Sequence, residues 1–130
     1  MNGLLLDTHV WLWFLIGSAR LSEAAKEAIT HEDTSIWLSP LSVWELTVLV
    51  RKRRFEVDGD VQAFIDRAFA ALPVRSASVD VAAARLADGL DLPQQDPVDR
   101  LLAATALSRH LRLVTADRSL RQAPWLDTVW

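Results

Sequence analysis

The stretch Asp96-Pro97-Val98-Asp99-Arg100-Leu101-Leu102-Ala103-Ala104 decides how this sequence folds. Asp96 is typical of a helix N-cap, and Pro97 of the first helical residue, where a missing N–H costs nothing. Asp99 then lies in the first turn of the helix, beside Asp96. Two carboxylates at one helix start either bind a divalent cation or complement the helix dipole. This stretch alone leaves both interpretations open.

Length and composition indicate one globular domain spanning residues 1–130. Hydrophobic residues make up 51% of the chain, enough for a real core. The chain has no cysteine, which excludes a disulfide scaffold and a cysteine-ligated zinc site and is compatible with the reducing cytoplasm. No signal peptide or apolar stretch of membrane-spanning length is present, so we expect a cytoplasmic protein without membrane contact.

The charge balance limits the possible partners. The formal net charge is −3, whereas a nucleic-acid binder usually has a positive surface. That objection weakens if several acids gather at a metal site, because the rest of the surface is then neutral or basic. Six tryptophans are many for this length and indicate a large interface as well as a core.

Short apolar runs alternate with helical patterns along the chain. This order predicts an α/β fold, a three-layer α/β/α sandwich with a mostly parallel central sheet. Residues 10–16 are apolar on all sides, so we expect a protein partner to cover part of them. The expected strands cover residues 3–6, 35–38, 73–75, 111–114 and 125–130, and the expected helix N-caps are Ser22, Ser39, Asp60, Ser78 and Asp96.

Three further acids stand where a carboxylate needs an explanation. Asp7 and Asp117 each follow an apolar strand, and ligands bind at the carboxyl ends of parallel strands. For each acid taken alone, the N-cap of a following helix is the favoured explanation. Glu45 has mostly apolar neighbours three and four positions away, where an ionised carboxylate is costly without a cation or donors. A position at the rim of the core, in reach of water, is the alternative for Glu45.

One cation-binding cluster explains these acids together. Carboxylates without cysteine, and without a clear histidine ligand set, favour Mg²⁺ or Mn²⁺ over zinc. Hard cations held by acids at an open site usually serve phosphate chemistry, in which the ion activates a water molecule and stabilises the leaving oxygen.

The ordered motifs resemble those of a PIN domain, and most closely those of VapC-type ribonuclease toxins. They are Leu4-Leu5-Leu6-Asp7-Thr8-His9-Val10-Trp11-Leu12-Trp13, Ser42-Val43-Trp44-Glu45-Leu46, the Asp96 stretch and Leu113-Val114-Thr115-Ala116-Asp117. The resemblance covers the whole chain. It implies an Mg²⁺- or Mn²⁺-dependent endoribonuclease that cleaves RNA, forms a homodimer and is inhibited by a partner antitoxin.

The resemblance also assigns roles to individual residues. Its catalytic, metal-binding acids correspond to Asp7, Glu45, Asp99 and Asp117. Asp96 matches a further acid whose part in metal binding is less certain. Thr8 and Thr115 match hydroxyl positions that orient the carboxylates, and Arg100 is a supporting residue that either pairs with the acids or meets phosphate.

Two further interpretations remain open. Arg51, Lys52, Arg53 and Arg54 end a predicted helix, where they either complement its C-terminus in solvent or contact the RNA backbone. The chain as a whole could be a catalytically silent PIN-like interaction module. The presence of all four acids argues against a silent module. A haloacid-dehalogenase-like phosphatase is set aside because His9 stands where that class needs a second aspartate.

Overall fold

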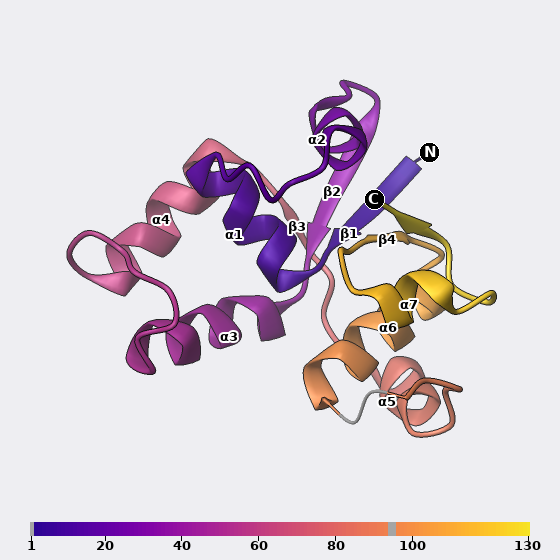
Figure 1. The fold of residues 1–130 in the computed structure, drawn as a ribbon. Helices are drawn as coiled ribbons and strands as arrows, with labels where there is room; N and C mark the ends of the chain where they lie inside the picture. The colour runs from indigo at the N-terminus through magenta and orange to yellow at the C-terminus, as the bar shows by residue number, and fades with distance from the viewer. Residues whose placement is uncertain (1, 94–95) are drawn as a thin grey trace.

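A five-stranded sheet with helices on both faces forms the body of the protein (Figure 1). The computed structural model describes residues 2–93 and 96–130. The strands are β1 (Asn2–Leu6), β2 (Thr34–Leu38), β3 (Arg75–Ser76), β4 (Arg112–Val114) and β5 (Thr128–Val129). The helices are α1 (Thr8–Ile16), α2 (Glu23–Thr30), α3 (Pro40–Arg51), α4 (Val61–Ala71), α5 (Val81–Ala87), α6 (Pro97–Arg109) and α7 (Arg118–Gln122).

The strands run in the order β3-β2-β1-β4-β5, and all four pairings are parallel. The central strand β1 pairs with β2 on one side, where Leu4 lies opposite Ile36, and with β4 on the other, where Leu6 lies opposite Val114. The carboxyl ends of β1 and β4 therefore meet at one edge of the sheet. The predicted α/β fold with a mostly parallel sheet is confirmed.

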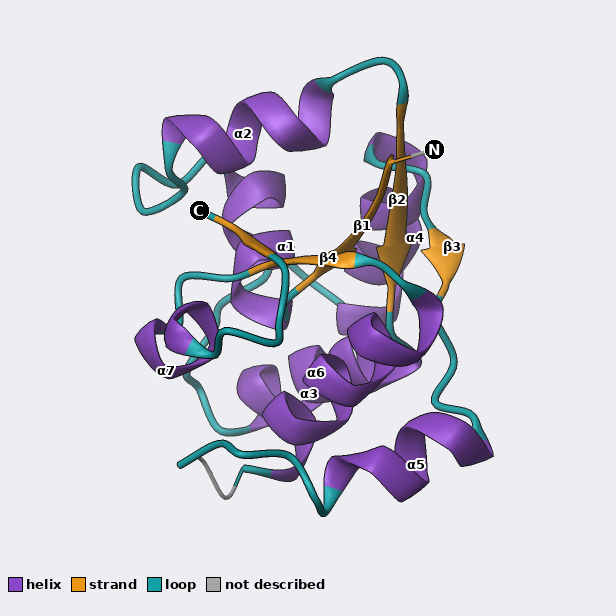
Figure 2. Ribbon diagram, turned by 90° about the vertical axis from the view of Figure 1, so that its right-hand side faces the viewer, coloured by secondary structure: helices purple, strands orange, loops and turns teal. Residues whose placement is uncertain are grey.

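Alternate side chains of β1 separate the helices into two layers. Leu4 and Leu6 belong to a core that includes residues of α1, α2, α3 and α4, whereas Leu5 belongs to a second core with residues of α6 and α7. Successive side chains of a strand point to opposite faces, so these helices cover opposite faces of the sheet. Figure 2 shows α2 and α5 at opposite ends of the molecule, with the sheet between them.

Most of the predicted helix starts are confirmed by capping hydrogen bonds. The Ser39 hydroxyl accepts from Leu41 N at 3.1 Å, and Pro40 follows as the first helical residue. The predicted cap at Ser78 is wrong. Helix α5 begins two residues later, because the Asp80 carboxylate accepts from Ala83 N at 2.8 Å. The other predicted caps, Ser22, Asp60 and Asp96, stand at the starts of α2, α4 and α6.

The strand expected over residues 125–130 is shorter than predicted. Only Thr128 and Val129 pair with β4, because β4 itself spans three residues. Residues 118–122, which the apolar pattern did not indicate as a helix, form α7 directly after Asp117. At the other edge of the sheet, the strand expected over residues 73–75 begins two residues later and spans Arg75–Ser76.

The apolar run at residues 10–16 is covered largely by this chain. Val10, Trp11 and Leu12 are buried, and Trp13 is half-buried. Ile16 is 54% exposed, whereas the other residues of the run are buried or half-buried. The expectation that a partner must cover this segment is therefore reduced to its C-terminal end. No helix of the described residues is long and apolar enough to cross a membrane.

Candidate active site

Five carboxylates from separate parts of the chain line one hollow at the carboxyl edge of the sheet. The hollow has a volume of about 450 Å³. We call it the acid hollow; its lining consists of Asp7, His9, Val10, Trp13, Arg20, Glu45, Asp96, Asp99, Ala116 and Asp117. All the acids singled out in the sequence are in this set. Five of the 17 acidic residues and one of the 14 basic residues, Arg20, line the hollow, so 13 basic residues and 12 acids remain elsewhere.

The Thr115 hydroxyl joins the acids of two neighbouring strands. It donates a hydrogen bond to Asp7 Oδ2 at 2.7 Å and accepts one from Asp117 N at 3.1 Å. Asp7 follows β1 and Thr115 follows β4, and Asp7 N also donates to Val114 O at 3.0 Å. The pairing of β1 with β4 therefore fixes the separation of Asp7 and Asp117. The orienting role expected of Thr115 is visible in these contacts.

Capping explains some of these acids and not others. Asp117 Oδ1 accepts from Leu120 N at 3.0 Å, and Asp96 Oδ1 accepts from Val98 N at 2.9 Å. Asp7 stands at the N-cap position of α1 but makes no side-chain capping bond. Asp99 lies within the first turn of α6, three residues after the cap position. The cap interpretation therefore accounts for Asp117 and Asp96 in part, and leaves Asp7 and Asp99 unexplained.

The pKa values show how strongly the acid hollow disfavours charge. The pKa of Asp99 rises from 3.8 to about 7; burial is the largest cause, and the charges of the other four acids add to it. Burial also raises the pKa of Asp7, against the lowering effect of the Thr115 hydrogen bond. Asp7 is only 8% exposed. Negative charge held in this way is typical of a site that a cation completes.

Helix α3 brings Glu45 to the hollow from the other side. Glu45 is half-buried, and its negative charge contributes to the raised pKa of both Asp7 and Asp99. One turn earlier on the same helix, Ser42 is fully buried and accepts a 2.8 Å hydrogen bond from Thr8 Oγ1. Thr8 therefore ties α1 to α3 and positions Glu45, whereas the sequence led us to expect a contact with a carboxylate.

Comparison with known proteins gives the family. A family model described as PIN domain matches residues 4–126. Ribonuclease VapC22 of Mycobacterium tuberculosis is 36% identical over 132 residues, covering 100% of both chains. The chain is a PIN domain of the VapC type. The predicted family is confirmed.

Solved structures share the fold of this PIN domain at lower identity. The structure of VapBC2 from Rickettsia felis, bound to a promoter DNA fragment, superimposes with a TM-score of 0.72 at 16% identity and covers 97% of this chain and 96% of that one. A toxin-antitoxin complex from Klebsiella pneumoniae gives a TM-score of 0.67 at 21% identity, covering 97% and 95%. At these identities the likeness shows the fold.

Arg100 holds the loop that leads into α6. Its guanidinium donates to the backbone oxygens of Ala87, Asp88, Leu90 and Leu92, at 3.0, 3.1, 2.8 and 3.3 Å. These bonds connect the end of α5 with the first turn of α6, where Asp96 and Asp99 lie. Arg100 of this PIN domain therefore acts on the backbone beside the acid hollow.

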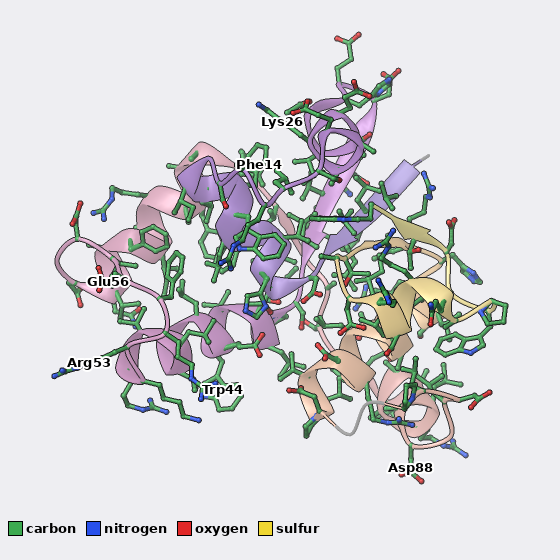
Figure 3. All side chains as sticks on the ribbon, viewed as in Figure 1. Phe14, Lys26, Trp44, Arg53, Glu56 and Asp88 are labelled. Carbon is green, nitrogen blue, oxygen red and sulfur yellow. The ribbon has the colours of Figure 1, made fainter. Side chains whose placement is uncertain are left out.

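The four consecutive cations at the end of α3, residues 51–54, do not form one continuous patch. The helix ends at Arg51, and Arg53 has left-handed backbone with φ of 58°. Figure 3 shows Arg53 pointing away from the body of the molecule. Arg54 instead lines a second hollow, which shares His9, Trp13 and Arg20 with the acid hollow. Of the four predicted RNA contacts, Arg54 is thus the one placed next to the acids among the described residues.

Several lining residues were not predicted from the sequence. Arg20 follows α1 in an irregular segment and carries no motif, so only the fold could reveal it. His9, to which the sequence analysis gave no role in the site, is exposed, and its ring centroid lies 6.0 Å from that of Trp13. Ser42 does not line the hollow. Its position three residues before Glu45 on the same helix was a weak indication that it lies close to the site.

The donor set of the acid hollow fits a hard divalent cation. All five acids supply oxygen ligands, which Mg²⁺ and Mn²⁺ prefer. Among residues 2–93 and 96–130, no three or more His, Cys, Asp or Glu are arranged as a ready-made metal site. Mg²⁺ usually keeps several water ligands and is bound through one or two carboxylates, and like charges without a cation repel one another. The hollow therefore suits an ion with part of its water shell.

Proposed function

We propose that this PIN domain, residues 1–130 as one unit, is a metal-dependent endoribonuclease and the toxin of a toxin–antitoxin pair. The observation that carries the proposal is the acid hollow, in which residues from β1, α3, α6 and the end of β4 bring five carboxylates together. The 36% identity to Ribonuclease VapC22 supports RNA as the substrate. We further propose that it acts in the cytoplasm, consistent with the absence of cysteine.

In this proposal Asp7, Glu45, Asp99 and Asp117 hold Mg²⁺ or Mn²⁺, and Asp96 is an additional acid at the rim. When bound, such an ion lowers the pKa of water and stabilises the oxygen that leaves phosphorus. The Thr115 hydroxyl keeps Asp7 oriented, as its 2.7 Å hydrogen bond requires. Burial and the neighbouring acids raise the pKa of Asp99 to about 7, so its carboxylate would bind a cation more readily as the pH rises through neutrality.

Expression in cells tests the proposal directly. Induced wild-type protein should arrest growth and generate new RNA 5′ ends that carry phosphate. The Asp7→Asn variant, which keeps the size of the side chain, should do neither. Purified wild-type protein should lose RNA cleavage in excess chelator and regain it with added Mg²⁺ or Mn²⁺. Cleavage that persists in chelator, or in Asp7→Asn, contradicts metal-dependent hydrolysis; a folded wild-type protein that cleaves no RNA favours the silent interaction module.

We also propose two protein partners, an antitoxin and a second copy of the chain. Trp44 on α3 is 57% exposed and points away from the body of the molecule (Figure 3). Nearby, an apolar hollow of about 580 Å³ between α3, α4 and β3 includes Val43 and Phe69, of which Phe69 is 38% exposed. Apolar surface of this kind is typical of protein interfaces. Sedimentation of Asp99→Asn protein, alone and with the product of a neighbouring reading frame, tests both partners; a monomer that binds no such product contradicts them.

A further inference from the structure

Two arginine-lined hollows adjoin the acid hollow. The first, which we call the Arg54 hollow, has a volume of about 340 Å³ and lies between α1 and the end of α3. Arg20, Arg54, Trp13 and Phe55 are among its lining residues. It shares Arg20, Trp13 and His9 with the acid hollow, so the two are direct neighbours.

The second flanking hollow, the Arg121 hollow, lies beside α7. It has a volume of about 440 Å³ and is lined by Arg118, Arg121, Gln122, Thr128 and Trp130. Arg118 directly follows Asp117, a lining residue of the acid hollow. The Trp130 and Trp13 rings also meet, with centroids 6.0 Å apart. The Arg121 hollow therefore lies near the acid hollow on the side of β4 and β5, although the two share no lining residue among those that the structure describes.

Charge is sharply divided among the three hollows. All five carboxylate side chains line the acid hollow, whereas no Asp or Glu is among the described residues that line the Arg54 hollow or the Arg121 hollow. Arg20, Arg54, Arg118 and Arg121 are exposed, and within residues 2–93 and 96–130 none of them forms an ion pair with an acid. Their positive charge is therefore available to a ligand.

A polyanion that crosses five carboxylates needs attraction on both sides of them. Four unpaired arginines supply it here, and guanidinium groups bind phosphate oxygens in a fork-like geometry. Trp13 lines the Arg54 hollow and Trp130 lines the Arg121 hollow; both are half-buried, and unpaired bases commonly stack on such aromatic rings. Gln122 and Thr128 add polar groups for base edges. Phosphate contacts flanked by aromatic rings are typical of single-strand recognition.

We propose that the Arg54 hollow and the Arg121 hollow bind single-stranded RNA on the two sides of the phosphate that is cleaved. This inference rests on the proposed nuclease function and adds the path of the substrate. It replaces the predicted contact through the whole run from Arg51 to Arg54 by Arg54 together with Arg20, Arg118 and Arg121. Arg54, Arg118 and Arg121 lie outside the acid hollow, and Arg20 lines both the acid hollow and the Arg54 hollow. In this proposal all four are binding residues that contact RNA phosphates.

The test measures RNA binding separately from cleavage. All variants are made in the Asp99→Asn protein, which is expected not to cut its ligand. A fluorescent single-stranded RNA of about 15 nucleotides, near the upper site size of single-strand binders, is titrated and followed by anisotropy. One variant carries Arg20→Gln and Arg54→Gln, and another carries Arg118→Gln and Arg121→Gln. The control, with the same loss of charge, carries Lys26→Gln and Arg85→Gln at exposed positions outside these hollows.

The expected loss follows from counterion release. Each phosphate contact to a single strand contributes about −0.7 to the slope of log K against log salt, so losing two contacts makes the slope less negative by about 1.4. With equal affinity near 1 M salt, this makes binding about 25-fold weaker at about 0.1 M salt. The single variants Arg54→Gln and Arg121→Gln should each lose about fivefold, and they replace the double variants if those do not fold. The control should keep the parent affinity and slope.

Other outcomes overturn the inference. Either double variant, folded by circular dichroism and with the parent affinity and salt slope, shows that its hollow does not bind RNA. Arginine variants that lose binding of a protein partner but keep RNA affinity assign the hollows to that partner instead. No measurable RNA binding by folded Asp99→Asn protein also overturns the path. If the arginine variants weaken binding while wild-type protein cleaves no RNA with any divalent metal, the nuclease proposal fails and the binding path stands.

Discussion

Replacing Asp99 by asparagine should stabilise the metal-free protein as it abolishes RNA cleavage. The pKa of Asp99 is about 7 in the folded protein, against 3.8 for an ordinary aspartate. Between these values the folded protein binds more protons at this site than the unfolded chain does. The free energy of unfolding therefore falls as the pH rises from about 4 through 7, and the penalty is complete above the folded pKa. Asparagine has the same shape and removes the charge that causes the penalty.

The magnitude follows from the difference in pKa. About three pKa units correspond to about 4 kcal/mol at 1.36 kcal/mol each. Because Asp99 is only half-buried, solvent screening reduces this to about 2 kcal/mol. A chain of 130 residues has an unfolding entropy of about 0.27 kcal/mol/K, so the gain corresponds to about 7 °C in melting temperature.

Thermal melts in chelator at a series of pH values measure this gain. Asp99→Asn should melt about 7 °C above wild type near pH 8, and the two proteins should converge near pH 4. The matched control is Asp66→Asn, a change at an exposed position on α4 outside the acid hollow, which should leave the curve unmoved. The reasoning is refuted if Asp99→Asn gains nothing near pH 8, or gains equally at both pH values.

Three other variants or conditions test the same site. In urea unfolding, Thr115→Val should lower the free energy of unfolding by about 1–3 kcal/mol, because Asp117 N and Asp7 Oδ2 both lose a hydrogen-bond partner. Thr115→Ser keeps the hydroxyl and should retain most of the stability. Arg100→Ala should lower the free energy of unfolding by about 2–4 kcal/mol, and Arg100→Lys by somewhat less, because backbone oxygens between α5 and α6 lose their donors. Both variants should also be cut faster by proteases between α5 and α6. Unchanged proteolysis would contradict the role of Arg100 in holding that segment. Mg²⁺ at about 100 times its Kd should stabilise wild type by about 2.7 kcal/mol, or about 10 °C, and should stabilise Asp99→Asn much less; equal shifts place the ion elsewhere.

The sequence was most informative where a chemical pattern coincided with a strand end or a helix start. Asp7 and Asp117 follow apolar runs, and parallel strands bring such positions to one edge of the sheet. Asp96 and Pro97 mark the start of α6 with little ambiguity, because an N-cap residue and a proline at the first helical position both indicate a helix N-terminus. The acidic residues of the hollow could therefore be predicted from the sequence, whereas their distances and hydrogen bonds could not.

Contacts between segments without a motif could not be predicted. The hydrogen bond from Thr8 to Ser42 depends on how α1 packs against α3, which no local pattern specifies. Arg20 lies in an irregular segment that only the fold brings to the acids. Ser78 and Asp80 are both good helix caps by residue type, so propensity does not decide between them; in the structure Asp80 caps α5.

Anomalous diffraction from crystals soaked in Mn²⁺ tests the central claim most directly, namely that the acid hollow binds a divalent cation. We expect a peak in the hollow, about 2.1 Å from oxygens of one or two carboxylates among Asp7, Asp99, Asp117 and Glu45. The peak should vanish in crystals of Asp99→Asn soaked in the same way. A wild-type hollow without a peak at saturating Mn²⁺, or an equal peak in Asp99→Asn, would contradict the account.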